Sequence, residues 1–257
     1  MTWGVVYLRR APLECLEHLV KKLQPLPWDP RAVLPSEARA ALSLDHHDPP
    51  IVLQINRQIL NDHDYQRLFN EHLSAEEQLH HGAFRRQEDR QRFLLGRAGL
   101  RILLAQLLDL DPQKLLIQCT SHGKPVFVVD SIELPPHFNI SHAGDLVLLA
   151  LHPSLAVGVD VERLNRSCHW ERLAQRVLSA AELAALQELP PQQRSAKMLL
   201  YWCRLEAELK CLGHGLAGLE ALEARRLRQG ASNRVLRQWD LTMEAGYCGA
   251  LACLDLS

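Results

Sequence analysis

The alternation of apolar and polar residues predicts a strand over residues 155–162, near the middle of the chain. Successive side chains of a strand point to opposite faces. One face of this strand is entirely apolar: Leu155, Val157, Val159 and Val161. The opposite face carries Ala156, Gly158, Asp160 and Glu162. Because acids are depleted in strands, the two carboxylates are either ligands of a hard divalent cation or solvated groups at a loop mouth beside Arg163.

Further strands follow from the same pattern. The apolar run Leu146–Leu151 is joined to the acidic strand by the turn 152–154, and two apolar strands with so short a connection predict a central hairpin. Strands are also expected over 51–55, over 126–129 and within about 216–256. Residues 1 to 50 are interrupted by prolines, with a short strand at 5–7 and a short amphipathic helix over 13–23 as the only candidates.

Helical periodicity predicts two long helices, from about Glu88 to Leu108 and from Ala196 to Leu212. Each follows a shorter helix that opens with a capping motif, Ser74 with Glu77 in one case and Ser179 with Glu182 in the other.

The two capped helices also repeat one another. Leu178-Ser179-Ala180 repeats Leu73-Ser74-Ala75 at an offset of 105 residues (178 minus 73), and Leu199-Leu200 repeats Leu94-Leu95 at the same offset. The repeat predicts an α+β fold of two similar halves related by a pseudo-twofold axis. We expect an N-terminal extension of uncertain structure at 1–50, an N-terminal half at 51–153 and a C-terminal half at 154–257. The acidic strand then lies at the interface of the halves, where ligand sites tend to occur.

The nearly neutral net charge of the chain argues against nucleic acid as a partner, although it excludes few other functions. The chain has 257 residues, 47% hydrophobic and 23% charged, with a formal net charge of -1. Six arginines at the start of the first long helix form either a solvated face or a site for a multiply charged phosphate: Arg85, Arg86, Arg90, Arg92, Arg97 and Arg101. Neutral net charge and the lack of interleaved aromatic residues argue against DNA or RNA binding through them.

The seven cysteines are odd in number and scattered without any C-x-x-C pair, which argues against a disulfide framework or a zinc cluster. They are typical of reduced thiols in a cytosolic protein. The N-terminus lacks a charged segment followed by an apolar one, and no run approaches eighteen apolar residues. We therefore expect a soluble cytoplasmic protein with no membrane partner.

Glu206 and Lys210 are four residues apart and share a face of the second long helix. Taken alone, they predict an ordinary surface ion pair worth roughly 0.3–0.5 kcal/mol. They gain meaning from four other motifs that precede them.

In this order, the five motifs resemble those of the Sfp-type 4'-phosphopantetheinyl transferases, over about residues 70 to 256. They are Gly123-Lys124-Pro125, Phe138-Asn139-Ile140-Ser141-His142, Gly158-Val159-Asp160-Val161-Glu162, Leu178-Ser179 with Glu182, and Trp202 with Glu206 and Lys210.

The resemblance implies an enzyme that moves the phosphopantetheine arm of coenzyme A to a serine of an acyl, polyketide or peptidyl carrier protein, releasing adenosine 3',5'-bisphosphate. Asp160, Glu162 and Glu206 are then expected to hold Mg²⁺ or Mn²⁺ at the coenzyme's pyrophosphate. Lys210 is expected to contact the pyrophosphate and to stabilise or protonate the leaving phosphate. Either Glu206 or a metal-bound water takes the proton of the carrier's serine.

The same resemblance assigns coenzyme binding to Lys124, Asn139, Ser141, His142 and Lys210. The adenine end is placed against the turn 123–125, with Ser141 and His142 near the phosphates and Lys124 adding positive charge. His142 has an alternative role as a structural hydrogen-bonding group. The carrier protein is expected to dock between the halves, and a chain that already contains both halves is expected to be a monomer.

The chain departs from the family pattern beside the helix glutamate. The family usually has a lysine there, whereas this chain has Leu205, with Arg204 one position earlier. Adjacent helix positions differ by about 100°, so Arg204 is not a simple replacement. Weaker coenzyme binding is one hypothesis, and a catalytically impaired homologue that binds coenzyme A or a carrier protein is the alternative function. Basic residues that often hold the 3'-phosphate are also absent from the first capped helix, for which Arg85, Arg86 or Arg92 are candidate substitutes.

Overall fold

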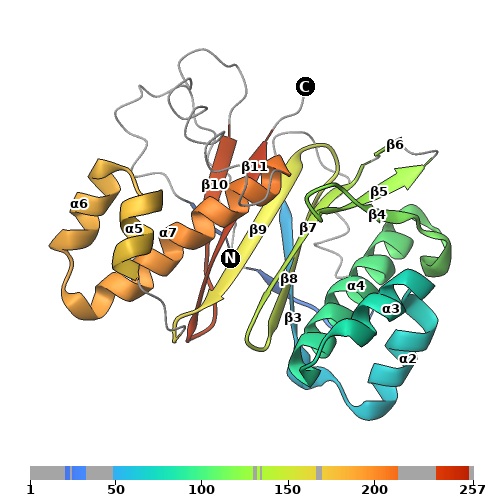
Figure 1. Cartoon of the computed structure of the whole chain (residues 1–257). Helices are drawn as coiled ribbons and strands as arrows, with labels where there is room; N and C mark the ends of the chain where they lie inside the picture. Colours follow the sequence, from blue (N-terminus) through green and yellow to red (C-terminus); the bar gives the residue numbers. More distant parts are fainter. Residues whose placement is uncertain are drawn as a thin grey trace, which may run out of the picture.

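Figure 1 shows a computed structural model of the chain, which describes residues 21–23, 25–32, 49–129, 132–133, 135–165, 170–213 and 236–254. The helices are α2 (Asp62–His72), α3 (Ala75–Ala83), α4 (Gln87–Leu108), α5 (Trp170–Val177), α6 (Ala180–Glu188) and α7 (Pro191–Leu212), with 3-10 turns η2 (Arg57–Ile59) and η3 (Pro112–Lys114). The strands are β1 (Lys21–Leu23), β2 (Leu26–Pro27), β3 (Ile51–Asn56), β4 (Ile117–Cys119), β5 (Pro125–Val129), β6 (Ile132–Glu133), β7 (His137–Ala143), β8 (Leu146–His152), β9 (Ala156–Arg163), β10 (Leu236–Leu241) and β11 (Tyr247–Leu254).

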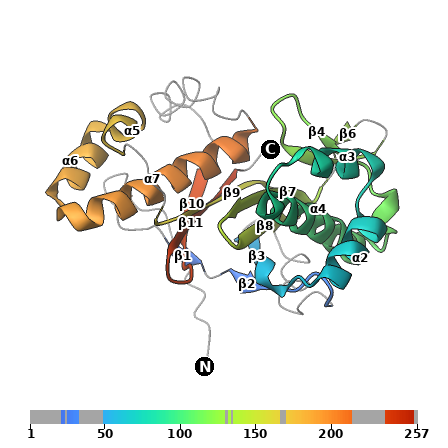
Figure 2. The same ribbon diagram turned by 60° about the horizontal axis from the view of Figure 1, so that its bottom comes forward.

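The strands form two four-stranded sheets, each covered by helices, and the predicted α+β fold of two similar halves is confirmed. One sheet has the order β2-β3-β8-β7 and the other β1-β10-β11-β9, with a small third sheet β4-β5-β6. In both halves the first long strand pairs antiparallel with the last one: β3 with β8, and β9 with β11. In Figures 1 and 2, α4 lies over the first sheet and α7 over the second, with β7 and β9 side by side between them.

The predicted central hairpin is wrong. The apolar strand β8 pairs with β7 and β3, whereas the acidic strand β9 pairs with β11 in the other sheet. Both edges of β8 are therefore occupied, which leaves none for β9. The hairpin forms one connection earlier, where Ala143 pairs with Leu146 across a two-residue turn. Gly144 in that turn has φ 55°, a left-handed conformation that glycine adopts readily.

The repeat seen in the sequence is a repeat of structure. Ser74 Oγ accepts a hydrogen bond from the Glu77 amide at 3.2 Å, and Ser179 Oγ accepts one from the Glu182 amide at 3.3 Å, so both predicted capping boxes form. The long helices that follow each have 22 residues. The second begins at Pro191, five residues before the predicted start, because proline is well tolerated in the first turn of a helix.

The core confirms the two-faced character of β9. Its apolar face packs between the sheets against side chains of β8, β10 and β11, in the cluster that contains Leu148, Trp239 and Leu251. Its other face lies against α7. A larger cluster fills the space between α4 and the first sheet.

The short strands from the N-terminal region join both sheets. β1 pairs in parallel with β10 of the C-terminal half, and β2 pairs in parallel with β3 of the N-terminal half. The helix predicted over 13–23 is wrong at residues 21–23, which form β1, while 13–20 and the strand expected at 5–7 lie outside the described residues. Among the described helices, none is long and apolar enough to cross a membrane.

Candidate active site

Backbone contact between β9 and α7 positions the acidic residues. A Cβ added to Gly158 would lie 2.1 Å from the carbonyl oxygen of Ala207 and 2.3 Å from the amide nitrogen of Cys211. Only glycine permits this approach, and Figure 1 shows α7 crossing β9. The acids that follow Gly158 on the same face of the strand therefore lie beside the C-terminal turns of α7.

A pocket of about 360 Å³ opens where β7, β9 and α7 meet. It is lined by Ile140, Ser141, His142, Asp160, Val161, Glu162, Trp202, Glu206 and Lys210. Residues separated by some seventy positions in the sequence thus share one cavity. The lining residues include all the predicted metal ligands, both predicted catalytic residues and three of the five predicted coenzyme contacts.

Asp160, Ser141 and Lys210 form a hydrogen-bonded cluster inside this pocket. The ammonium of Lys210 donates to Asp160 Oδ1 at 2.6 Å and to Ser141 Oγ at 3.2 Å. Ser141 Oγ in turn donates to the same Asp160 Oδ1 at 2.9 Å. Ser141 and Asp160 are both buried. One carboxylate oxygen of Asp160 therefore has two donors, supplied by β7 and α7.

The types of donor in the pocket suit a divalent cation. The second oxygen of Asp160, Oδ2, is buried and has no hydrogen-bond partner. Three carboxylates face one ammonium among the lining residues, so the pocket carries excess negative charge, and carboxylate oxygens are the ligands that Mg²⁺ prefers. Within the described ranges, no three His, Cys, Asp or Glu side chains are grouped closely enough to hold a metal ion. The positive charge nearest Asp160 in this arrangement is that of Lys210.

His142 lies at the open side of the pocket. Desolvation by the surrounding protein lowers the pKa of its ring, and the positive charges of Arg92 and Lys210 lower it further, although the residue as a whole is exposed. The imidazole is therefore neutral at pH 7. Arg92 itself donates to the carbonyl of Gly144 at 2.7 Å and pairs with Asp89, which holds it at the β7–β8 turn.

Two predicted coenzyme contacts do not line the pocket. Lys124 Nζ donates to the carbonyl oxygens of Val157 at 3.2 Å and Cys211 at 3.3 Å, and so attaches the turn before β5 to β9 and to the end of α7. Asn139 Oδ1 accepts a hydrogen bond from the amide of Val159 at 2.9 Å, which joins β7 to β9. Both side chains act across the boundary between the halves.

The departure beside the helix glutamate has a structural explanation. Leu205 is 4% exposed, packs in a cluster with Leu209 and is not among the residues that line the pocket. Arg204 forms a two-point ion pair with Asp240 of β10 at 2.8 and 2.9 Å, and its guanidinium also lies over the ring of Tyr201. Arg204 is thus a link between α7 and β10, and it does not replace the missing lysine in the pocket.

A cysteine pair that the sequence does not predict lies next to the acids. Cys203 Sγ lies 3.8 Å from Cys248 Sγ, and Cys248 is paired with Glu162 across β11 and β9. Burial raises the pKa of Cys203, and its contact with Cys248 and the charge of Asp160 act in the same direction. Scattered cysteines have no spacing motif, so only the fold brings these two together.

Most of the arginines in the predicted run are engaged within the N-terminal half. Arg101 is buried and donates to Glu77 Oε2 at 2.7 Å, and Arg90 donates to the carbonyl of Phe84 at 2.9 Å. The guanidinium of Arg97 lies over the ring of Phe93. Arg85 and Arg86 are exposed.

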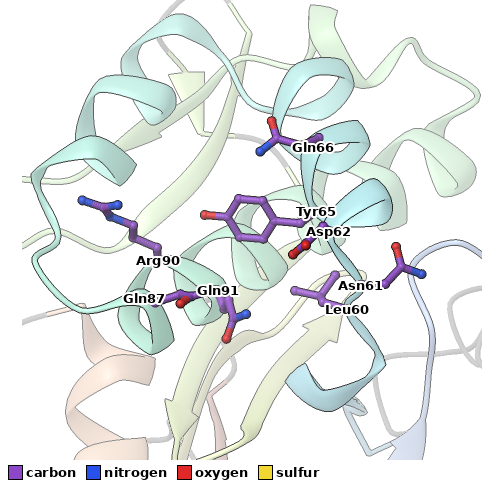
Figure 3. Close-up of a pocket in the computed structure, with 8 residues that line it drawn as sticks. All are labelled: Leu60, Asn61, Asp62, Tyr65, Gln66, Gln87, Arg90 and Gln91. Carbon is purple, nitrogen blue, oxygen red and sulfur yellow. The ribbon is translucent and has the colours of Figure 1, made fainter.

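A second cavity, of about 270 Å³, lies between the starts of α2 and α4 (Figure 3). Its lining is mostly polar: Leu60, Asn61, Asp62, Tyr65, Gln66, Gln87, Arg90 and Gln91. The hydroxyl of Tyr65 lies 2.5 Å from His81 Nε2. None of these residues belongs to the acidic pocket.

Comparisons with known proteins cover both halves. A family model described as the 4'-phosphopantetheinyl transferase superfamily matches residues 156–250, and one described as 4'-phosphopantetheinyl transferase, N-terminal, matches residues 61–154. Their boundary falls between β8 and β9.

Curated relatives point the same way. The 4'-phosphopantetheinyl transferase HetI of Nostoc sp. is 34% identical over 151 residues, 59% of this chain and 64% of the relative. The 4'-phosphopantetheinyl transferase AcpT of Escherichia coli is 36% identical over 124 residues, 48% of this chain and 58% of the relative. The L-aminoadipate-semialdehyde dehydrogenase-phosphopantetheinyl transferase of Mus musculus is 28% identical over 192 residues, 72% and 59% respectively. The matches thus span less than two thirds of each relative. With two family models that meet between β8 and β9, and with the acids of β9 and α7 in one pocket, this chain belongs to the 4'-phosphopantetheinyl transferase superfamily.

Proposed function

We propose that the chain transfers the 4'-phosphopantetheine arm of coenzyme A to a serine hydroxyl of an acyl or peptidyl carrier protein, converting the apo form to the holo form. The observation that carries this proposal is the convergence of Asp160, Glu162, Glu206 and Lys210 in one pocket, within the region that the superfamily matches. The names of the relatives support the same reaction.

In this reaction the serine oxygen forms a bond to the phosphorus that carries the pantetheine. The bond from that phosphorus to the bridging oxygen of the pyrophosphate breaks, and adenosine 3',5'-bisphosphate leaves. The serine proton passes to the carboxylate of Glu206, which lines the pocket from α7. Lys210, one helical turn further along the same helix, stabilises the negative charge that develops on the leaving phosphate.

Asp160, Glu162 and Glu206 are the residues that would hold a divalent cation, Mg²⁺ or Mn²⁺, which supplies positive charge to the pyrophosphate when bound. Ser141 orients the Asp160 carboxylate through its hydrogen bond to Oδ1. His142, being neutral, offers a hydrogen bond at the open side of the pocket without adding to its charge.

Lys124 and Asn139 contribute to coenzyme binding indirectly in this proposal. Their hydrogen bonds hold the turn 123–125 and strand β7 against β9. The coenzyme site is therefore shaped by both halves, and a chain containing both acts as a monomer in the cytoplasm. Light scattering that gave a trimer mass would contradict the monomer.

The test is intact-mass spectrometry of apo carrier proteins incubated with the protein, coenzyme A and Mg²⁺. We expect the carrier to gain one phosphopantetheine arm, and we expect Asp160→Asn to abolish the gain. Glu171→Gln is the matched control, since it removes an exposed acid of α5 that does not line the pocket, and it should leave the gain intact.

The alternative is the catalytically impaired homologue. If no carrier from fatty acid, polyketide or peptide synthesis gains an arm while calorimetry still detects coenzyme A binding, the transferase is refuted in favour of that alternative. If neither coenzyme A nor a carrier protein binds, both are refuted.

A further inference from the structure

Lys210 occupies the position at Asp160 that a metal ion would be expected to take. Its ammonium lies 2.6 Å from Asp160 Oδ1. Asp160 belongs to a central segment of β9 and is 5% exposed, whereas the Lys210 side chain is 28% exposed. The carboxylate is therefore fixed by the sheet, and the ammonium is attached through a long side chain that has room to move.

The charges of the pocket make this contact favourable in the absence of other cations. Asp160, Glu162 and Glu206 bring three negative charges, His142 is neutral at pH 7, and Lys210 is the one lining residue with a positive charge. Carboxylates so placed repel one another unless a cation lies among them. Lys210 reduces that repulsion.

A divalent cation on the Asp160 carboxylate competes with Lys210 for the same group. Oδ1 already accepts hydrogen bonds from Lys210 and Ser141, and Oδ2 is buried without a partner. A cation bound to either oxygen comes within a few ångströms of the Lys210 nitrogen, where like charges repel strongly because little water separates them.

We propose that Lys210 is a built-in counter-ion that holds Asp160 until a divalent cation displaces it, and that the released ammonium then binds the phosphates of the coenzyme. Since those phosphates are the ones named under the proposed function, this inference rests on that function. Ser141 keeps its hydrogen bond to Oδ1 throughout, so the carboxylate stays oriented while its cation is exchanged.

This exchange couples the two ligands. The cation has to displace Lys210, and a phosphate group gives the displaced ammonium a new partner. Cation and coenzyme therefore strengthen each other's binding, and the effect is the same in both directions.

The experiment measures Mn²⁺ binding to the whole protein by the electron paramagnetic resonance signal of free Mn²⁺, with and without coenzyme A. Without coenzyme, Lys210→Met should bind Mn²⁺ about fivefold more tightly than the wild type or better, the lower end of a typical coupling. Coenzyme A should then tighten Mn²⁺ binding much less in the variant than in the wild type.

Two variants serve as controls. Lys197→Met removes the same charge from α7, but this lysine lies over the ring of Tyr201 and does not line the pocket, so Mn²⁺ binding should equal that of the wild type. Lys210→Arg keeps a cation beside Asp160 and should also bind Mn²⁺ weakly. If circular dichroism shows that Lys210→Met is unfolded, Lys210→Gln takes its place.

The outcomes separate this inference from the proposed function. If Lys210→Met binds Mn²⁺ no more tightly than the wild type, while Asp160→Asn abolishes binding, the metal site stands and the exchange is overturned. If Asp160→Asn binds Mn²⁺ as well as the wild type, or if no Mn²⁺ binds even with coenzyme A, the metal site of the proposed function fails and the exchange fails with it.

Discussion

Gly158→Ala is the smallest change that should separate β9 from α7. The new methyl group would lie 2.1 Å from the carbonyl oxygen of Ala207 and 2.3 Å from the amide nitrogen of Cys211, and both are backbone atoms of a 22-residue helix. Contacts of a real Cβ are essentially never under 3.0 Å, so the helix has to retreat by at least 0.9 Å (3.0 minus 2.1).

The cost follows from the packing that this movement loosens. Overpacking a core by one methyl group typically costs about 1–3 kcal/mol, and a backbone obstacle that cannot rotate away places Gly158→Ala at about 3 kcal/mol or more. For a domain of this size, that loss lowers Tm by roughly 6–12 °C. The same shift moves Glu206 and Lys210 away from Asp160, and a misplacement of about 1 Å can reduce turnover about 100-fold.

Urea unfolding followed by circular dichroism measures the stability, and carrier modification measures the turnover. The matched control is Gly82→Ala on α3, where an added Cβ meets nothing within 4 Å. That variant should be stabilised by about 0.5–1 kcal/mol, because alanine restricts the unfolded chain more than glycine does. A loss below about 0.5 kcal/mol in Gly158→Ala, within the range of ordinary surface substitutions, would refute the reasoning.

Three further variants test other parts of the structure. Arg101→Met leaves the buried carboxylate of Glu77 without its ion-pair partner and should lower the free energy of urea unfolding by about 3–5 kcal/mol. The double variant with Glu77→Gln should recover part of this loss. No recovery would contradict the role of the ion pair. Burial lowers the pKa of His81, and the charge of Arg90 lowers it further. The unfolded state therefore takes up the proton first, and stability should fall as pH drops below about 6.5. His81→Gln should flatten this dependence of stability on pH between pH 7 and 5.5, and an unchanged slope would argue against this explanation. Leu205→Lys should lower the free energy of unfolding by about 2–5 kcal/mol, as much as a core truncation, because it puts an ammonium in the place of a buried side chain. A lower KM for coenzyme A at unchanged stability would instead show that position 205 reaches the pocket.

The parts of the fold set by neighbouring residues could be read from the sequence. Both capping boxes, the extent of α4 and the two faces of β9 depend on spacings of a few positions, which is why the sequence predicts the caps Ser74 and Ser179 correctly. The charged residues that line the pocket could be predicted for a related reason, since Asp160 and Glu162 share a strand face, and Glu206 and Lys210 share a helix face.

The parts set by distant residues could not be predicted. The partners of β8 depend on which strand edges remain open after the sheet assembles, and the run of apolar residues is the same in either pairing. Lys124 donates to backbone carbonyls, which every residue possesses, so no residue type marks its acceptor. Arg204 finds Asp240 across 36 positions, and nothing in the helix sequence indicates this strand as its neighbour.

The two N-terminal strands bear on the order in which the chain folds as it is synthesised. Leu26 of β2 pairs with Leu53, only 27 residues later (53 minus 26), so that contact can form early. Lys21 of β1 pairs with Trp239, 218 residues later (239 minus 21), and has to wait for almost the whole chain. Contacts between such distant positions form slowly, because a long loop must close before the pairing is gained. The C-terminal sheet is therefore expected to close last on the ribosome, with β1, the first strand among the described residues, added at its edge.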